Sequence, residues 1–428
     1  MNARPPTLFL LIDAIPFDLA WEAWNQGAMP GFLEPRASVS VFPSLTDVAV
    51  PALLRSIGGE RPPGYEARWY HAPSGEIRGP GDPASEAAMA PFQGRPRGVL
   101  AQAALYVLRG GLAYAQIRWI THRFAREGGA WLGYLSATDG VGHFSGRGEL
   151  RRAFDDVLAA VDAVRREHRR RAGAWPDAVL CSDHGMAFGR LHHLSEHALA
   201  AHLAGGGFRS GERGRDGAVL VPWGEVGSGA VYADPARAPE LAALVARAPG
   251  VDVAFGIDGE GCLAFQSGGA RARLSWRGER HRYEALAGDP LGHAPVFEAL
   301  GREGALDEEG FAPDAPLFAA TWRAAYPDAL ARVRRGLVDL VEHPAPWLFS
   351  LGDYWTFGPA LTHAGAVLLG GQVGTHGALS AAQSLGFAAA TEDAGDPWPG
   401  APALRSEQVF APWGALLRGG DPRGASER

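Results

Sequence analysis

Short apolar runs alternate with amphipathic segments through the first half of the chain. Each apolar run has the length expected of a strand that is buried on both faces. The strand-like runs are residues 7–12, 37–42, 130–137 and 177–182. The segments with apolar positions at helical spacing are residues 46–57, 99–124 and 149–171. Strands that alternate with helices predict an α/β core, built on a mostly parallel central sheet flanked by helices.

The pattern changes after residue 204. Short β-like runs lie between residues 219 and 286, around one expected helix at 239–248, and helical segments follow at 294–335. This arrangement predicts a smaller α+β section inserted into the core. Buried-strand character returns at 347–351 and 366–369.

These changes in pattern predict the organisation of the whole chain. Glycine and proline are frequent between residues 58 and 98, which predicts an excursion from the sheet, and again after residue 400, which predicts a poorly ordered tail. The expected order is a first core part at 1–204 with a cap excursion at 58–125, an inserted section at 205–340, a second core part at 341–400 and a tail at 401–428.

Composition excludes several classes of function. The formal net charge is −7, and lysine is absent, so all 40 Lys/Arg positions are arginine. A nucleic-acid polymer is therefore not an expected partner, and Schiff-base lysine chemistry is excluded. Two cysteines form no disulfide framework. The apolar stretch near the N-terminus ends at Asp13, too early for a secretory signal, and no apolar run reaches membrane-span length. We expect a cytoplasmic protein.

Three strand-like runs end at or near an acid, namely Asp13, Asp139 and Asp183. Ligands of open α/β sheets bind beyond the carboxyl ends of the strands, so parallel strands would bring these carboxylates to one edge. Because like charges repel, such a cluster is disfavoured unless cations neutralise it. Taken alone, each acid has a simpler interpretation, such as the cap of a following helix.

Histidines accompany these acids. His143 follows Asp139 by four residues, with two glycines between them that would allow a tight loop. His184 follows Asp183 directly, and Gly185 would permit the turn that lets both side chains face one site. His376 lies between two glycines late in the chain. Imidazole and carboxylate together are typical ligands of zinc, and they also suit manganese or iron.

The order of these motifs resembles that of the alkaline phosphatase superfamily, and most of all its type I phosphodiesterase/nucleotide pyrophosphatase branch. The matching stretches are FPSLT at 42–46, TDGVGHFSG at 138–146, SDHGM at 182–186 and GTHG at 374–377. The resemblance implies an alkaline phosphatase-like core with two divalent metal ions, zinc being expected and manganese or iron the alternatives. It assigns Asp139, His143 and His376 to one ion, and Asp13, Asp183 and His184 to the other. Thr46 would be the nucleophile, bound beside the second ion.

The same resemblance implies a metal-dependent phosphoester hydrolase that acts on a small-molecule phosphoester through a phospho-threonine intermediate. A phosphodiester or a nucleotide-like pyrophosphate is the expected substrate. The alternatives on the same core are a phosphomonoesterase and a phosphonate hydrolase. An alternative of another class is a metal-binding module with little catalysis.

Some positions depart from the branch or compete with these assignments. Asp47 follows Thr46 where the branch continues differently, and Arg68 stands where the branch carries an asparagine that binds phosphate. Ser44 competes with Thr46 as the nucleophile. His363 competes with His376 as the third imidazole. Aromatic side chains at 119, 131, 134 and 144 would stack on a nucleobase or, alternatively, pack in the core.

A further histidine pair, His193 and His197, has the four-residue spacing of a zinc-binding helix. The expected metal sites already have ligands, so we interpret this pair as structural or surface residues.

Overall fold

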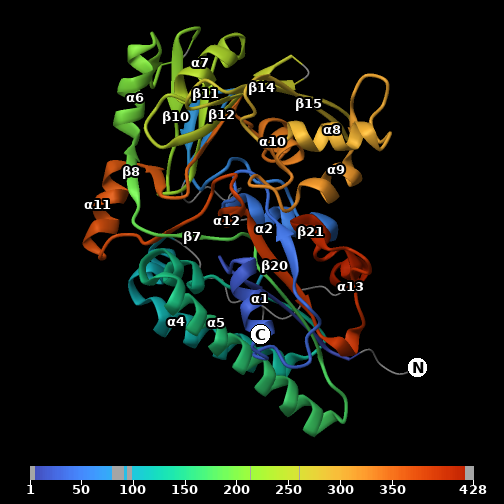
Figure 1. The fold of residues 1–428 in the computed structure, drawn as a ribbon. Helices are drawn as coiled ribbons and strands as arrows, with labels where there is room; N and C mark the ends of the chain where they lie inside the picture. Colours follow the sequence, from blue (N-terminus) through green and yellow to red (C-terminus); the bar gives the residue numbers. More distant parts are fainter. Residues whose placement is uncertain (1–4, 80–90, 94–98, 213, 260, 420–428) are drawn as a thin grey trace.

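The computed structural model describes residues 5–79, 91–93, 99–212, 214–259 and 261–419. Residues 80–90 and 94–98 of the expected cap, and residues 420–428 of the expected tail, lie outside these ranges. The described chain folds around two large β-sheets (Figure 1). The central sheet and its helices occupy the lower half of this view, and the second sheet lies above them.

Within the described residues, the central sheet contains β1 (Thr7–Ile12), β2 (Arg36–Val39), β5 (Ala130–Leu135), β6 (Asp177–Cys181), β20 (Leu385–Ala390) and β21 (Ala403–Arg405). Their order is β21-β2-β20-β6-β1-β5. The pairs β1/β5, β1/β6 and β2/β21 are parallel, and β20 runs against both of its neighbours. The fold is therefore α/β with a mostly parallel central sheet, as predicted.

Helices cover both faces of the central sheet. On one face lie α1 (Phe17–Asn25), α4 (Val99–Glu127) and α5 (Ala137–Ala172), and on the other lie α2 (Thr46–Leu54) and α13 (Gly414–Gly419). Strand β1 shows why both faces are covered. Its Leu8, Leu10 and Ile12 pack with α1, α4 and α5, whereas Phe9 and Leu11 pack with α2. An uninterrupted apolar strand thus buries alternate side chains in two separate cores.

Part of the expected cap at 58–125 belongs to the core of the central sheet. Ile117, Ile120 and Phe124 of α4 are buried in the same cluster as the β1 side chains. The apolar positions of α4 therefore form a layer against the sheet. A short hairpin of β3 (Trp69–His71) and β4 (Glu76–Arg78) lies in the other described part of this range.

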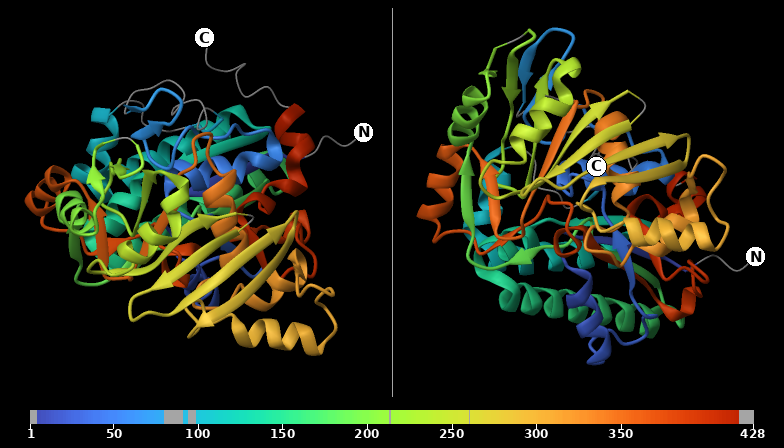
Figure 2. Two further views of the ribbon diagram at one scale, coloured as in Figure 1. Left: turned by 90° about the horizontal axis from the view of Figure 1, so that it is seen from above. Right: turned by 45° about the horizontal axis from the view of Figure 1, so that its top comes forward.

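In the part of the chain that the structure describes, the second sheet contains β9 (Arg209–Ser210), β10 (Gly217–Leu220), β11 (Ser228–Ala233), β12 (Val251–Asp258), β13 (Gly261–Gln266), β14 (Arg271–Arg277), β15 (Arg280–Ala287), β16 (Ala312–Pro313) and β17 (Trp347–Leu351). Their order is β16-β15-β14-β13-β12-β17-β11-β10-β9. One face packs on α6 (Glu196–Gly205) and α7 (Ala238–Val245). The other face packs on α8 (Ala294–Arg302), α9 (Asp314–Thr321) and α10 (Ala329–Val338). Figure 2 shows β12 to β15, in yellow-green, beside the orange helices.

The boundaries of the inserted section differ from the sequence-based expectation. Strand β17 lies between β12 and β11 in the second sheet, although residues 341–400 were expected in the core. The core instead resumes with β20, and β21 of the expected tail is an edge strand of the central sheet. Buried apolar runs give no information about which sheet they join, because that choice depends on distant partners.

Residues 366–369, predicted as a strand, belong mostly to the helix α11 (Ala360–Leu368). Ala366 is its one buried member, and the side chains of Leu361 and Leu368 are 85% and 88% exposed. A four-residue apolar run does not distinguish a strand from a helix. The other strands and α-helix of the described chain are the pair β7 (Ala187–Phe188) with β19 (Gly374–Thr375), the pair β8 (His192–Ser195) with β18 (Trp355–Gly358), and α12 (Ala381–Ser384).

None of the described helices combines the length and the apolar character needed to cross a lipid bilayer.

Candidate metal centre

The carboxyl ends of three neighbouring parallel strands bring the predicted acids together. Leu11 of β1 is paired with Cys181 of β6, and Ile12 is paired with Leu135 of β5. Asp13 and Asp183 therefore leave their strands at the same edge. The Asp183 Oδ1 atom accepts a hydrogen bond from the backbone N–H of Ala14, at 3.3 Å, which fixes the two loops against each other.

Asp139 and His143 lie on a helix, not in the expected glycine loop. They are one turn apart near the start of α5, and the helical geometry is interrupted only at Gly146, where φ is 81°. The glycine at 142 serves close packing, because a Cβ atom there would lie 2.5 Å from the sulfur of Met186. A helical i, i+4 spacing places both side chains on one face.

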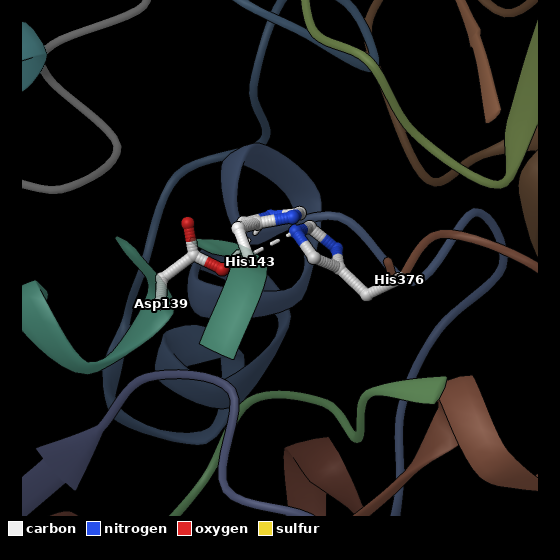
Figure 3. A group of neighbouring side chains, drawn as sticks. All are labelled: Asp139, His143 and His376. Atoms are coloured by element: carbon white, nitrogen blue, oxygen red, sulfur yellow. Dashed lines mark ion pairs between the residues drawn. The ribbon is translucent and has the colours of Figure 1, made fainter. Parts of the chain in front are cut away.

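Asp139, His143 and His376 form the first group of side chains (Figure 3). The Nε2 atoms of His143 and His376 lie 3.2 Å and 3.4 Å from the same carboxylate oxygen, Asp139 Oδ1. All three residues are buried. His376 follows β19, which pairs with β7 just after the Asp183–His184 segment. His363 lies elsewhere, so the structure brings His376 to this position.

Asp13, Asp183 and His184 form the second group. The Nε2 atom of His184 is 3.3 Å from Asp183 Oδ2 and 3.6 Å from Asp13 Oδ1. The two groups adjoin, since the rings of His184 and His376 are stacked with centroids 3.9 Å apart. All the predicted acids and imidazoles thus surround one buried volume.

The hydroxyl of Thr46 belongs to the same site. Thr46 begins α2, and its Oγ1 atom lies 3.2 Å from His184 Nε2. The rival hydroxyl of Ser44 is fully buried and donates a hydrogen bond to the carbonyl of Ala378, at 2.9 Å. The hydroxyl of Thr46, and not that of Ser44, therefore lies beside the carboxylate and imidazole side chains.

Backbone carbonyls orient all three imidazoles in the same way. The Nδ1 atoms lie 2.8 to 3.0 Å from carbonyl oxygens, with His143 on Gly374, His184 on Gly185 and His376 on Ser44. An Nδ1–H that donates to a carbonyl leaves the lone pair on Nε2, the atom that faces the carboxylates. Metal-binding histidines are commonly fixed by such outer contacts.

Position 185 requires a glycine because there is no room for a side chain, and not because the backbone angle is unusual. Its φ lies outside the positive range, whereas a Cβ atom there would lie 2.4 Å and 2.7 Å from the carbonyl oxygens of Ala382 and Leu385. The turn after His184 therefore needs a glycine because another chain segment passes directly against it.

Without a bound cation, electrostatics disfavour this close grouping of buried carboxyl groups. Burial, with the charges of Asp183 and Asp139, raises the pKa of Asp13 well above its usual range, and burial raises the pKa of Asp183 to about 6. Burial acts in the same direction on Asp139, but His143 and His376 outweigh it and lower its pKa. Burial and the nearby His376 lower the pKa of His184. Three buried carboxyl groups thus lie close together, and their like charges act against one another.

Two tyrosines complete the site and were not predicted. Tyr134 of β5 donates a hydrogen bond to Asp13, and Tyr106 of α4 donates one to Asp139 at 3.1 Å. From the sequence, Tyr134 was expected either to stack on a base or to pack in the core. Its place on β5, the strand that leads to Asp139, was the available signal.

A pocket adjoins the site on the side of the second sheet. Its walls include Leu45, next to Thr46, and the side chains of Glu66 and Arg68. The Arg68 guanidinium donates a hydrogen bond to the carbonyl of Pro222, at 3.5 Å. Arg68, which stands where the resembling branch carries an asparagine, therefore lines a pocket that also includes Leu45, the residue before Thr46.

Neither a protein-family model nor a curated protein sequence matches this chain. Among solved structures, it is similar to phosphonoacetate hydrolase from Sinorhizobium meliloti 1021 in complex with phosphonoacetate, with 14% identity over 97% of this chain and 96% of that chain and a TM-score of 0.49. It is also similar to human ectonucleotide pyrophosphatase/phosphodiesterase 5, with 11% identity over 96% and 94% and a TM-score of 0.48. Likenesses at this level assign no activity and no residue role to this chain.

Proposed function

We propose that this protein is a metal-dependent phosphoester hydrolase in which Thr46 is the nucleophile. One observation carries the proposal. Three imidazoles, each with Nδ1 on a backbone carbonyl, direct Nε2 at buried carboxylates beside the Thr46 hydroxyl. Phosphodiesters or nucleotide-like pyrophosphates are the substrate class that we expect first.

The side chains fit two divalent cations. Asp13 Oδ1, Asp139 Oδ1 and Asp183 Oδ2 are buried without a hydrogen-bond partner in the described structure. Each faces an imidazole lone pair, and such an arrangement of acceptors is unfavourable unless a cation lies between them. Asp139, His143 and His376 would hold one ion. Asp13, Asp183 and His184, with Thr46 beside them, would hold the other. Zinc is the expected metal, with manganese or iron as alternatives.

The reaction follows from the position of Thr46. When bound, the cations would lower the pKa of the hydroxyl and offset negative charge on the leaving oxygen. The Thr46 Oγ1 atom attacks phosphorus, the bond from phosphorus to the leaving oxygen breaks, and the alcohol departs with a proton. Water then attacks phosphorus in the covalent Thr46 intermediate, the bond from phosphorus to Oγ1 breaks, and the phosphomonoester leaves as the threonine hydroxyl regains its proton. Two displacements predict net retention of configuration at phosphorus.

Neighbouring groups support this chemistry. Thr46 occupies the first turn of α2, where backbone N–H groups suit phosphate oxygens. Tyr134 and Tyr106 hold Asp13 and Asp139 in place through their hydroxyls. These contacts position the ligand set without adding charge.

The pocket favours a second candidate substrate. Arg68 lines the cavity beside Leu45, where the resembling branch has a neutral donor. A guanidinium can bind two oxygens of a doubly charged phosphoryl group. A phosphomonoester or a phosphonate is therefore the alternative substrate on the same site.

Assays with zinc-loaded protein on bis-p-nitrophenyl phosphate and on p-nitrophenyl phosphate test the proposal. We expect turnover of the diester to exceed that of the monoester, and the reverse order would assign the monoesterase alternative. Replacing the nucleophile, Thr46→Ala, should lower kcat roughly 1,000-fold or more.

The matched control is Ser44→Ala, because this rival hydroxyl already bonds a carbonyl away from the site. It should keep most of the activity. Full activity of Thr46→Ala would show that the nucleophile is another group. Lack of turnover on both substrates, with metal bound, would favour a metal-binding module.

A further inference from the structure

A third cluster of side chains that could bind a metal ion lies outside the proposed reaction centre. It consists of His193, Glu225 and His363, each of which offers a ligand atom within 4.8 Å of the others. The three residues come from distant parts of the chain: β8, the loop before β11, and α11. From the sequence, His193 was expected to have a structural or surface role, and His363 was the rival of His376. The fold instead brings these two histidines together.

Both imidazoles face the same carboxylate oxygen. The Nδ1 atoms of His193 and His363 lie 3.1 Å and 2.8 Å from Glu225 Oε1. The two rings are stacked nearly parallel, with centroids 4.0 Å apart and an interplanar angle of 6°. Two histidines and one glutamate are a recurrent donor set for zinc and for divalent iron or manganese.

Several polar atoms of this cluster have no hydrogen-bond partner among the described residues. The side chain of Glu225 is only 4% exposed, yet its Oε2 atom has no hydrogen-bond partner in the described structure. The Nδ1 atom of His193 lies 3.1 Å from Oε1, but neither ring nitrogen of His193 has a hydrogen-bond partner in the described structure. Buried polar atoms without partners are costly, and a bound ion is one of the explanations that removes the cost.

The surroundings hold the carboxylate rigidly while leaving access for an ion. Thr356 of β18 donates a hydrogen bond to Glu225 Oε1 at 2.8 Å, and β18 pairs with β8 so that Thr356 stands opposite His193. The next residue, Val226, forms a bridge with Phe357. His363 has a side chain that is 40% exposed, which opens the cluster to solvent. The donor positions are thus fixed before any ion arrives.

The cluster is connected to the first group of the reaction centre. The backbone N–H of Gly227, two residues after Glu225, donates a hydrogen bond to the carbonyl of His376 at 2.7 Å. A change at the cluster can therefore reach His376 through a short stretch of backbone.

We infer that His193, Glu225 and His363 form an additional site for a divalent transition-metal ion, separate from the two proposed in the reaction centre. The ion would join α11 and β8 to the loop before β11. A site that binds through two imidazoles and one carboxylate should prefer zinc, manganese or iron over calcium or magnesium.

Metal counting tests this inference without using activity. Zinc-loaded protein, freed of unbound ions by gel filtration, is analysed for zinc per chain. We expect His363→Ala and Glu225→Gln each to hold one ion fewer than the wild type. His363→Ala is the stronger test, because this half-exposed residue on the surface helix α11 can be replaced without opening a core.

His197→Ala is the matched control, since it removes an exposed histidine of the neighbouring helix α6 and should leave the count unchanged. Titration of metal-free protein with cobalt, followed by visible absorption, should end one equivalent earlier in His363→Ala than in the wild type. Equal counts in wild type and His363→Ala would overturn the inference. Because the readout is a difference of one ion, it stands apart from the assay of Thr46.

Discussion

At the scale of single residues, burial decides which side chains have unusual pKa values. Glu66 illustrates this outside the metal centre. Its Oε2 atom accepts backbone hydrogen bonds from Gly224 and Trp223, at 2.6 Å and 3.3 Å, and burial nevertheless raises its pKa to about 7. A carboxyl with a raised pKa binds its proton more tightly in the folded state than in the unfolded state.

This shift predicts a pH-dependent stability. The contribution of Glu66 is complete below its ordinary pKa of 4.5 and is lost as the pH rises toward 7. Glu66→Gln removes that loss, so the variant should gain stability relative to wild type between about pH 5 and about pH 8. We expect about 1–2 kcal/mol, reduced from the full shift because the side chain is partly exposed. Thermal unfolding at the two pH values measures the difference. Glu298→Gln, at an exposed position of α8, should show no such change.

At the scale of elements, the sequence predicts the parts of the site that lie at strand ends. Asp13, Asp183 and His184 follow buried apolar strands, so the topology of a parallel sheet was enough to expect them together. Tyr134 and the cluster of Glu225 with two histidines were not accessible in this way. Tyr134 lies on β5 and bonds Asp13, which follows the neighbouring strand β1. The members of the cluster come from β8, the loop before β11 and α11. Both arrangements depend on which distant parts of the chain become neighbours.

The same reasoning explains the wrong predictions at element level. The run at 366–369 was too short to show a helical period, and β17 carries no mark of the sheet that it joins. The expected loop between Asp139 and His143 is helical, and Gly142 is needed there for close contact with Met186. Composition identifies a glycine, but the neighbour that requires it is visible only in the fold.

Gly185 provides the corresponding prediction. Its replacement, Gly185→Ala, must move the turn after His184 away from the carbonyls of Ala382 and Leu385. We expect a loss of about 1–3 kcal/mol in stability, as for other overpacked sites, together with weaker zinc binding. Gly148→Ala is the control, because a Cβ atom at this position of α5 meets nothing within 4 Å. A Gly185→Ala protein with unchanged unfolding temperature and zinc affinity would contradict the packing argument.

At the scale of the whole molecule, the candidate metal centre lies where the two sheets meet. The Ser44 N–H bonds the carbonyl of Gly377, and Gly227 of the second-sheet region bonds His376. Nearby, Arg332 of α10 is buried and donates hydrogen bonds to Val41 and Ser384 beside the central sheet. The contacts that hold the ligands are therefore also contacts between the two halves of the protein. Bound ions should stabilise the junction as well as the site.

Removal of metal should therefore destabilise the entire chain. Without cations, the buried oxygens of Asp13, Asp139 and Asp183 have no partners and their charges repel. Each ion bound at about 100 times its Kd contributes about 2.7 kcal/mol, which for a chain of this length corresponds to roughly 3 °C in Tm. We expect a chelator to lower Tm by at least this amount at neutral pH, and zinc to restore it. Asp183→Asn should respond less, since it has lost one ligand. If the wild type unfolds at the same temperature with chelator and with zinc, the centre holds no stabilising ion.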